Sequence, residues 1–167
     1  MRFFSANRYV ASVDLIDVDD LCDAGIRCVL VDRDNTLVPR DTKVAPPQVR
    51  SWLNDLASAG IVVCMVSNNF HTKAVCESAK DLGVHVVHHA MKPAPVAVHV
   101  ALSHMGASKE QAVLVGDQLF TDVMAGNLAG VKTILVKPQC TKDLWYTQFF
   151  RKFENLFLSN VSYEGEE

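Results

Sequence analysis

Residues 29–38 read Val29-Leu30-Val31-Asp32-Arg33-Asp34-Asn35-Thr36-Leu37-Val38. The apolar, β-branched run that opens this stretch has the length and composition of a buried strand. Two aspartates, Asp32 and Asp34, follow it with one residue between them. Open α/β sheets bind their ligands beyond the carboxyl ends of the strands, which is where this pair falls. Taken alone, the pair fits equally well a polar turn built from ordinary turn-forming residues.

Apolar runs of strand length alternate with amphipathic stretches of helix length along the rest of the chain. We expect strands at 26–31, 61–66, 84–87, 112–115 and 131–136. We expect helices at 18–24, 46–59, 71–82, 95–105 and 119–129, most of them followed by a glycine. This alternation predicts an α/β fold: a doubly wound, Rossmann-like, parallel five-stranded sheet in three layers.

The chain length of 167 residues fits a single domain. We assign that domain to residues 1–160, with an N-terminal lead-in segment over 1–25. Residues 141–160 form a terminal segment that is rich in aromatic residues and carries a basic pair. The acidic tip at 161–167 has the composition of a disordered tail.

Charge and cysteine content exclude several classes of protein. A net charge of −3 provides no basic face, so we expect no nucleic acid partner. The five cysteines are odd in number and lack C-x-x-C spacing, which favours a reducing, cytoplasmic setting over a disulfide framework. No apolar run approaches the roughly 18 residues that span a bilayer. We therefore expect a soluble protein, with peripheral contact at the inner face of the membrane as the alternative.

Polar side chains of chemical interest follow several of the expected strands. They are Asp32, Asp34, Ser67, Asn68, Lys92, Asp117 and Asp122. So many acids at one sheet edge would repel one another, which indicates a hard divalent cation, and Mg²⁺ suits oxygen ligands. A lysine and a hydroxyl beside such a metal suit a phosphoryl group.

Each of these residues also has an ordinary structural interpretation. Ser67 and Asn68 could cap the following helix, Lys92 could be a solvated surface residue, and Asp122 could favour a helix N-terminus. Three histidines, His85, His88 and His89, have loosely metal-like spacing. No cysteine or further acid completes a zinc set with them, so we expect structural residues or residues at the edge of the site.

Four segments together resemble the motifs of the haloacid dehalogenase superfamily. They are Asp32-Arg33-Asp34-Asn35-Thr36, Ser67-Asn68-Asn69, Lys92-Pro93 and Gly116-Asp117-Gln118-Leu119-Phe120-Thr121-Asp122. More narrowly, the chain is similar to the YqeG-like phosphatases of subclass IIIA, which are related to mitochondrial phosphatidylglycerophosphate phosphatases. The resemblance covers nearly the whole chain.

The resemblance implies a role for each motif residue. Asp32 would be the nucleophile that forms an aspartyl-phosphate, and Asp34 the general acid and then the base. Mg²⁺ would be held by Asp32, Asp117 and the backbone carbonyl of Asp34, with Asp122 completing the acidic site. The phosphoryl oxygens would be held by Ser67, the backbone N–H of Asn68, and Lys92.

Arg33 departs from the resemblance, because such proteins more often carry Leu or Lys there. Strand alternation would direct its side chain away from Asp32 and Asp34, so we expect little effect on the chemistry. The connections at 37–47 and 82–92 are too short for a cap domain. We expect an open site, unless a second subunit of an oligomer covers it.

An open site suits a phosphate on a large or surface-bound molecule, so the expected substrate is a lipid head group, phosphatidylglycerophosphate by resemblance, or else a soluble phosphorylated metabolite. Residues 144–158, helped by Phe3 and Phe4, could dock at a bilayer, or could be a terminal helix that packs on the core. A receiver-like phosphoryl-accepting signalling module is the competing class, and Asp34 argues against it. A dehalogenase is disfavoured, because it needs no metal-binding pair like Asp34 and Asp117.

Overall fold

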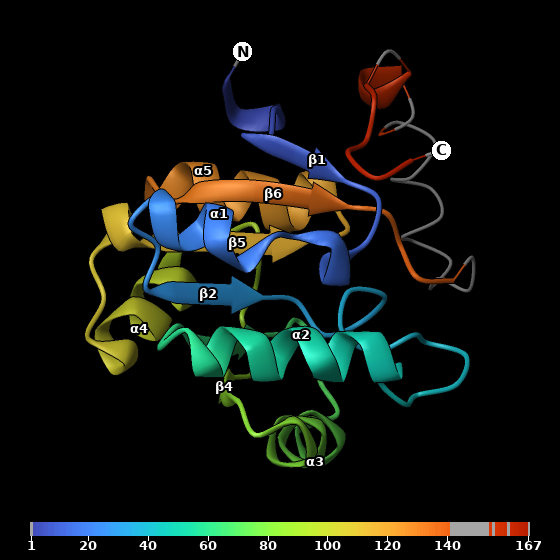
Figure 1. The fold of residues 1–167 in the computed structure, drawn as a ribbon, viewed down its shortest axis with the longest axis vertical. Helices are drawn as coiled ribbons and strands as arrows, with labels where there is room; N and C mark the ends of the chain where they lie inside the picture. The colour runs from blue at the N-terminus through green and yellow to red at the C-terminus, as the bar shows by residue number, and fades with distance from the viewer. Residues whose placement is uncertain (1, 141–153, 155, 160, 167) are drawn as a thin grey trace.

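A parallel six-stranded sheet forms the centre of the described part of the chain (Figure 1). The computed structural model describes residues 2–140, 154, 156–159 and 161–166. The strands are β1 (Arg8–Val10), β2 (Cys28–Val31), β3 (Val62–Val66), β4 (His85–Val87), β5 (Ala112–Gly116) and β6 (Lys132–Val136). Their order in the sheet is β1-β6-β5-β2-β3-β4. β2 is therefore central, and its carboxyl end leads into the two aspartates.

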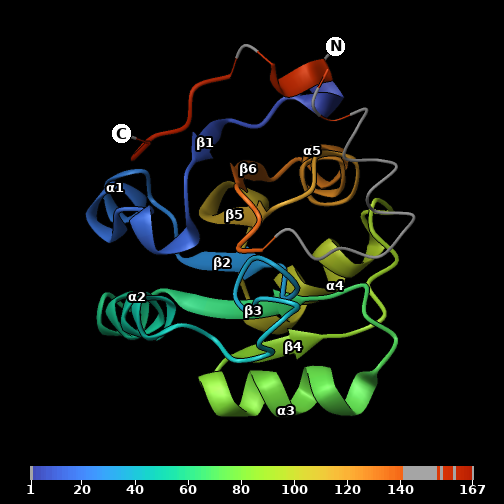
Figure 2. The same cartoon turned by 90° about the vertical axis from the view of Figure 1, so that its right-hand side faces the viewer.

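Helices cover both faces of the sheet, which gives three layers (Figure 2). The α-helices are α1 (Val18–Asp23), α2 (Pro47–Ser58), α3 (Thr72–Leu82), α4 (Val96–Met105) and α5 (Met124–Ala129). Shorter turns of helix are η1 (Arg2–Phe4), η2 (Val13–Leu15), η3 (Lys109–Gln111) and η4 (Leu119–Val123), the last with π-helical geometry. None of the described helices is long and apolar enough to cross a bilayer.

The side chains of β2 show how the two faces are filled. Val29 and Val31 point into the core beneath α1, α2 and α3, whereas Cys28 and Leu30 point into the core beneath α4 and α5. All four side chains are fully buried, as expected for a strand covered on both faces. The predicted fold class is thus confirmed. In the described residues, the connections from β2 to α2 and from β4 to α4 hold no additional domain.

The sheet has one strand more than the sequence predicts. β1 lies in the segment we assigned as a lead-in, and it pairs in parallel with β6 through Arg8 and Ile134. Three residues are too few to show a hydrophobic period in the sequence, so this strand is recognised only by its pairing with β6 in the structure. The acidic tip lies beside it: the backbone N–H of Glu164 donates to the carbonyl of Tyr9 (2.8 Å).

The aromatic C-terminal segment lies largely outside the described residues. Its described part, residues 154 and 156–159, lies near η1, where the rings of Phe4 and Phe157 are 5.8 Å apart. Leu158 packs against the small core cluster that contains Leu119. The expectation that 144–158 docks at a bilayer or packs on the core concerns residues that lie mostly outside the described part of the chain.

Candidate active site

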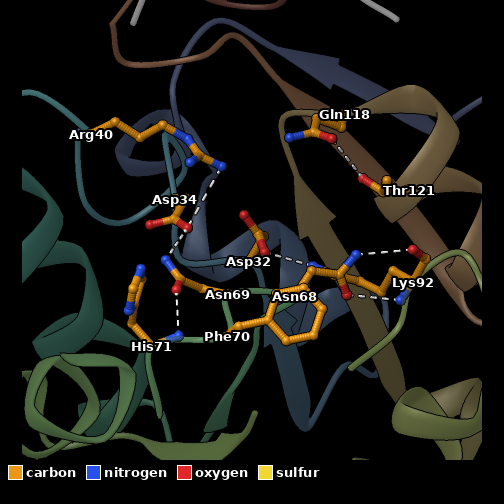
Figure 3. A pocket seen from close by; sticks show the side chains of 10 residues that line it. All are labelled: Asp32, Asp34, Arg40, Asn68, Asn69, Phe70, His71, Lys92, Gln118 and Thr121. Atoms are coloured by element: carbon orange, nitrogen blue, oxygen red, sulfur yellow. Dashed lines mark hydrogen bonds and ion pairs between the residues drawn. The ribbon is translucent and has the colours of Figure 1, made fainter. Parts of the chain in front are cut away.

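The two aspartates of the opening motif lie in a tight turn beyond the end of β2. The backbone N–H of Asp32 still donates to Val115 on β5 (2.9 Å), so Asp32 is held in line with the sheet. The turn then closes through the N–H of Asn35, which donates to Val38 (2.8 Å). Asn35 takes a positive φ of 62°, a conformation that asparagine tolerates better than most residues. The turn places both Asp32 and Asp34 along one cavity (Figure 3).

Lys92 connects the acidic residues from the opposite side. Its Nζ donates to Oδ1 of Asp32 (2.6 Å), to Oδ1 of Asp122 (2.7 Å) and to the carbonyl of Val66 (2.7 Å). Those contacts engage all three donors of the ammonium. Lys92 is buried, so it is a structural centre of the site and not the solvated surface residue of the alternative interpretation.

Burial and charge act in opposite directions on this pair. Burial raises the pKa of Asp32 to about 6, although Lys92 lowers it, and the carboxylates of Asp122 and Asp34 raise it further. Burial alone would lower the pKa of Lys92, but the carboxylates of Asp122 and Asp32 outweigh it and leave that pKa above its ordinary value. Lys92 is therefore charged at neutral pH, whereas Asp32 changes its protonation state near pH 6 in the absence of a metal ion.

Three buried carboxylates could hold a metal ion in the described residues. One oxygen each of Asp32, Asp117 and Asp122 lies within 4.8 Å of the others. Asp117 follows β5, and one of its oxygens accepts from the hydroxyl of Thr36 (3.1 Å). Asp122 uses both oxygens, since Oδ2 accepts from the N–H of Gln118 (3.1 Å) and Oδ1 faces Lys92. One ammonium opposite three acids leaves negative charge that a hard cation with oxygen ligands fits.

Gly116 lets Asp122 approach the sheet. A methyl group at position 116 would lie 2.2 Å from Cγ of Asp122, far inside any allowed contact. The glycine that precedes Asp117 is therefore required by the packing of a second acidic residue on the π-helical turn η4.

Arg33 corrects an expectation from strand alternation. Its Nη1 donates to Oδ1 of Asp34, and its Nε donates to Oγ of Ser78 on α3 (3.0 Å). β2 ends at Val31, so the alternating direction of side chains no longer applies at position 33. Arg33 is itself buried and connects Asp34 to α3.

Ser67 and Asn68 follow β3, as predicted, but their side chains form hydrogen bonds with backbone groups. Oγ of Ser67 accepts from the N–H of Asn69 (3.1 Å) and is not among the groups that line the cavity. Asn68 makes a reciprocal pair with Lys92: its Nδ2 donates to the carbonyl (2.9 Å) and its Oδ1 accepts from the N–H (2.8 Å). Asn68 lines the cavity and fixes the backbone that carries Lys92.

The cavity beside Asp32 has a volume of about 210 Å³. Its lining residues are Asp32, Asp34, Arg40, Asn68, Asn69, Phe70, His71, Lys92, Gln118 and Thr121 (Figure 3). Two of the lining residues that the sequence did not assign to the site contact Asp34. Nδ2 of Asn69 donates to Oδ2 of Asp34 (2.9 Å), and Nη2 of Arg40 lies 3.6 Å from the same oxygen. The repeated asparagine in Asn68-Asn69 was a sequence feature that could have indicated Asn69. No sequence feature indicated Arg40.

His85, His88 and His89 lie outside this cluster. All three are exposed, and none belongs to the group of carboxylates that could hold a metal. His89 instead bonds the hydroxyl of Thr72 through Nε2 (3.0 Å) and packs against the ring of His88.

Glu154 supports the site from the C-terminal segment. Its Oε1 accepts from the N–H groups of Leu119 (2.6 Å) and Phe120 (3.2 Å), which are the first donors of η4. A buried carboxylate there satisfies the free amides of the turn that carries Asp122. No motif in the sequence indicated this residue.

The sequence matches the family described as haloacid dehalogenase-like hydrolase over residues 8–130. It is 35% identical over 164 residues to the protein of Bacillus subtilis (strain 168) described as "Probable phosphatase YqeG", which covers 98% of this chain and 95% of that protein. It is 30% identical over 138 residues to "Phosphatidylglycerophosphate phosphatase 1, chloroplastic/mitochondrial" of Arabidopsis thaliana. That match covers 77% of this chain but only 39% of the plant protein.

Solved structures share the fold at lower sequence identity. The cobalt-bound deoxy-D-mannose-octulosonate 8-phosphate phosphatase of Haemophilus influenzae superposes with a TM-score of 0.55 at 16% identity, covering 81% of this chain and 89% of that one. A structure from Listeria monocytogenes serotype 4b has a TM-score of 0.58 at 20% identity, covering 72% and 84% of the two chains. At such identities the likeness bears on the architecture alone.

Proposed function

This chain belongs to the haloacid dehalogenase-like hydrolases and is a phosphatase. From that premise, we propose that it hydrolyses phosphomonoesters through an aspartyl-phosphate on Asp32, with Mg²⁺ as its cofactor. The observation that carries this proposal is the contact of Asp32 with Lys92 inside a cluster of buried acids. A nucleophile, a fixed cation and metal-type ligands then lie at one cavity, as phosphoryl transfer requires.

The residues of this chain divide the reaction into two steps. An oxygen of Asp32 attacks phosphorus, the bond to the leaving oxygen breaks, and Asp34 gives that oxygen its proton. Water then attacks the phosphoryl group, Asp34 takes a proton from it, and the bond to Asp32 breaks to release phosphate. Figure 3 supports the first step, since one oxygen of Asp32 faces Lys92 and the other points away from it.

Asp32 and Asp117 are the proposed ligands of Mg²⁺, together with the backbone carbonyl of Asp34. The contacts of Asp122 with Lys92 and Gln118 support an orienting role, with any metal contact made through water. When bound, the ion supplies positive charge against the negative charge of the phosphoryl oxygens. Lys92 supplies the second positive charge, while the backbone N–H of Asn68 is a further donor at the cavity.

The proposed substrate is phosphatidylglycerophosphate, with a soluble phosphorylated metabolite as the alternative. Two features support the lipid: the similarity to the Arabidopsis phosphatidylglycerophosphate phosphatase and the lack of an additional domain over the cavity in the described residues. A site without a cover can meet a phosphate that remains attached to a surface.

Turnover of a chromogenic aryl phosphate with Mg²⁺ tests the proposed reaction. We expect many turnovers by the wild-type protein and loss of turnover in Asp32→Asn and Asp34→Asn. A single, stable phosphorylation event would instead identify a receiver-like module. A substrate panel that compares vesicle-borne phosphatidylglycerophosphate with sugar and nucleotide phosphates tests the substrate, and hydrolysis of the soluble compounds alone would contradict the lipid.

A further inference from the structure

Three large apolar side chains are unusually exposed on the two segments that carry the cavity residues Phe70 and Lys92. The exposed fractions are 79% for Phe70, 73% for Met91 and 66% for Val96. Among the described residues, Leu156 (74%) and Val44 (61%) are the other large hydrophobic residues of comparable exposure. We call Phe70, Met91 and Val96 the apolar rim. Exposed apolar groups gathered at one place mark an interaction surface more often than scattered ones do.

The rim stands on two loops that are bonded to each other and on the first residue of α4, Val96. Residues 67–71 connect β3 to α3, and residues 88–95 connect β4 to α4. The N–H of Ala90 donates to the carbonyl of Ser67 (2.9 Å), and the rings of Phe70 and His89 are 5.6 Å apart. Met91 precedes the buried Lys92 directly, while its own side chain is exposed. The structure thus presents apolar groups outward from the same backbone that presents Lys92 inward.

The segments that carry the rim differ in charge from the rest of the chain. Residues 67–73 and 85–96 contain no Asp or Glu, although the protein carries a net charge of −3. They contain His71, Lys73, His85, His88 and His89 besides Lys92. Lys73 and the three histidines on the β4 side are exposed, and Nζ of Lys73 lies 4.0 Å from Oε1 of Glu77 on α3. An apolar rim on segments without acidic residues suits an anionic lipid bilayer, because these segments can insert apolar groups without setting carboxylates against the charged head groups.

We propose that the apolar rim docks the protein on an anionic lipid surface, with the mouth of the cavity turned toward the head groups. The inference rests on the proposed phosphatase function for its purpose, because docking there would bring a head-group phosphomonoester to Asp32. The docking itself is a binding event that needs no turnover. It also differs from docking by residues 144–158, and from docking by Phe3 and Phe4, which lie in η1 ahead of β1.

Sedimentation with lipid vesicles tests the docking separately from catalysis. The probe is mixed phosphatidylglycerol and phosphatidylcholine vesicles, compared with vesicles of phosphatidylcholine alone. The test variant is Met91→Gln/Val96→Gln, which removes exposed apolar surface and leaves the cavity lining unchanged. The matched control is Leu128→Gln, because Leu128 is 42% exposed on α5, near its junction with β6 at the other edge of the sheet.

We expect the wild type and Leu128→Gln to bind the anionic vesicles, and the double variant to bind at least about tenfold more weakly. All three proteins should turn over a soluble aryl phosphate equally. Equal vesicle binding by the double variant, or no vesicle binding by the wild type, would overturn the proposal. So would a wild-type dimer that the double variant dissociates, because a second copy would then cover the rim. Absence of aryl phosphate turnover by the wild type would contradict the proposed function, but it would not affect the test of docking by vesicle binding.

Discussion

Nζ of Lys92 lies 2.6 Å from Oδ1 of Asp32, and both groups are buried. The same ammonium lies 2.7 Å from Asp122, so one cation balances two carboxylates. Breaking a buried ion pair by removing one partner is far costlier than the pair's net contribution to stability. Lys92 is therefore expected to support the fold of the site as well as the binding of phosphate.

Replacing Lys92 tests this double role. Without Mg²⁺, Lys92→Met should lower the free energy of unfolding by on the order of 3–5 kcal/mol, because Asp32 and Asp122 lose their counter-charge. Mg²⁺ should restore part of the lost stability, but we expect the variant to show no turnover with or without the ion. Denaturant unfolding with and without the ion provides the measurement, and Lys73→Met is the exposed control. An unchanged unfolding midpoint would contradict the buried pairing.

Gly116→Ala should displace Asp122 from the sheet. The added methyl group would meet the carboxylate of Asp122, so we expect lower stability and a loss of turnover. The double variant Gly116→Ala/Asp122→Ala separates the causes, because it removes both partners of the clash. Recovery of stability, but not of activity, is the expected result of this cycle. Simple addition of the two single effects would show that the steric contact is unimportant.

Arg33→Leu should loosen Asp34 while leaving Asp32 in place. Asp34 would keep Asn69 as a donor but lose its connection to α3 through Arg33 and Ser78. We expect a loss of about 2 kcal/mol of stability, typical of hydrogen bonds to charged groups. We also expect kcat to fall more than KM changes, since Asp34 acts on the proton and not on binding. Wild-type kinetics in Arg33→Leu would confine Arg33 to a purely structural role.

The stability of the metal-free protein should depend on the ionisation of Asp32. Its pKa is raised to about 6 in the folded protein, so the folded state retains a proton that the unfolded chain releases. The free energy of unfolding contributed by this group should therefore fall as pH rises from about 4 to about 6. Mg²⁺ needs the ionised carboxylate, so the thermal shift that it produces should grow across the same range. Thermal denaturation in a pH series measures both trends, and both should vanish in Asp32→Asn.

Much of the fold and the centre of the site could be predicted from the sequence, because both follow from the positions of the strands. Once the apolar runs were placed, Asp32, Asp117 and Lys92 had to meet near one edge of a parallel sheet. β1 could not be predicted in the same way, since three residues carry no period of their own. The order of the strands required the structure.

The residues that were missed depend on local geometry and on long-range contacts. Arg33 reaches Asp34 because the strand has already ended, and Arg40 does so because the loop turns back over the cavity. Glu154 contacts η4 across a separation of more than thirty residues, from a segment whose pattern indicated only an aromatic helix. Such contacts are set by the closed tertiary structure and leave no periodic signal in the sequence.

Trapping the covalent intermediate tests the role of Asp32 most directly. Asp34→Asn is the suitable variant, because an aryl leaving group departs without an acid, whereas release of the phosphoryl group still needs a base. After incubation with aryl phosphate and Mg²⁺ and an acid quench, the intact mass should increase by one phosphoryl group, located on Asp32 by peptide mapping. No increase in mass, or a phosphoryl group on any other residue, would contradict the proposed mechanism.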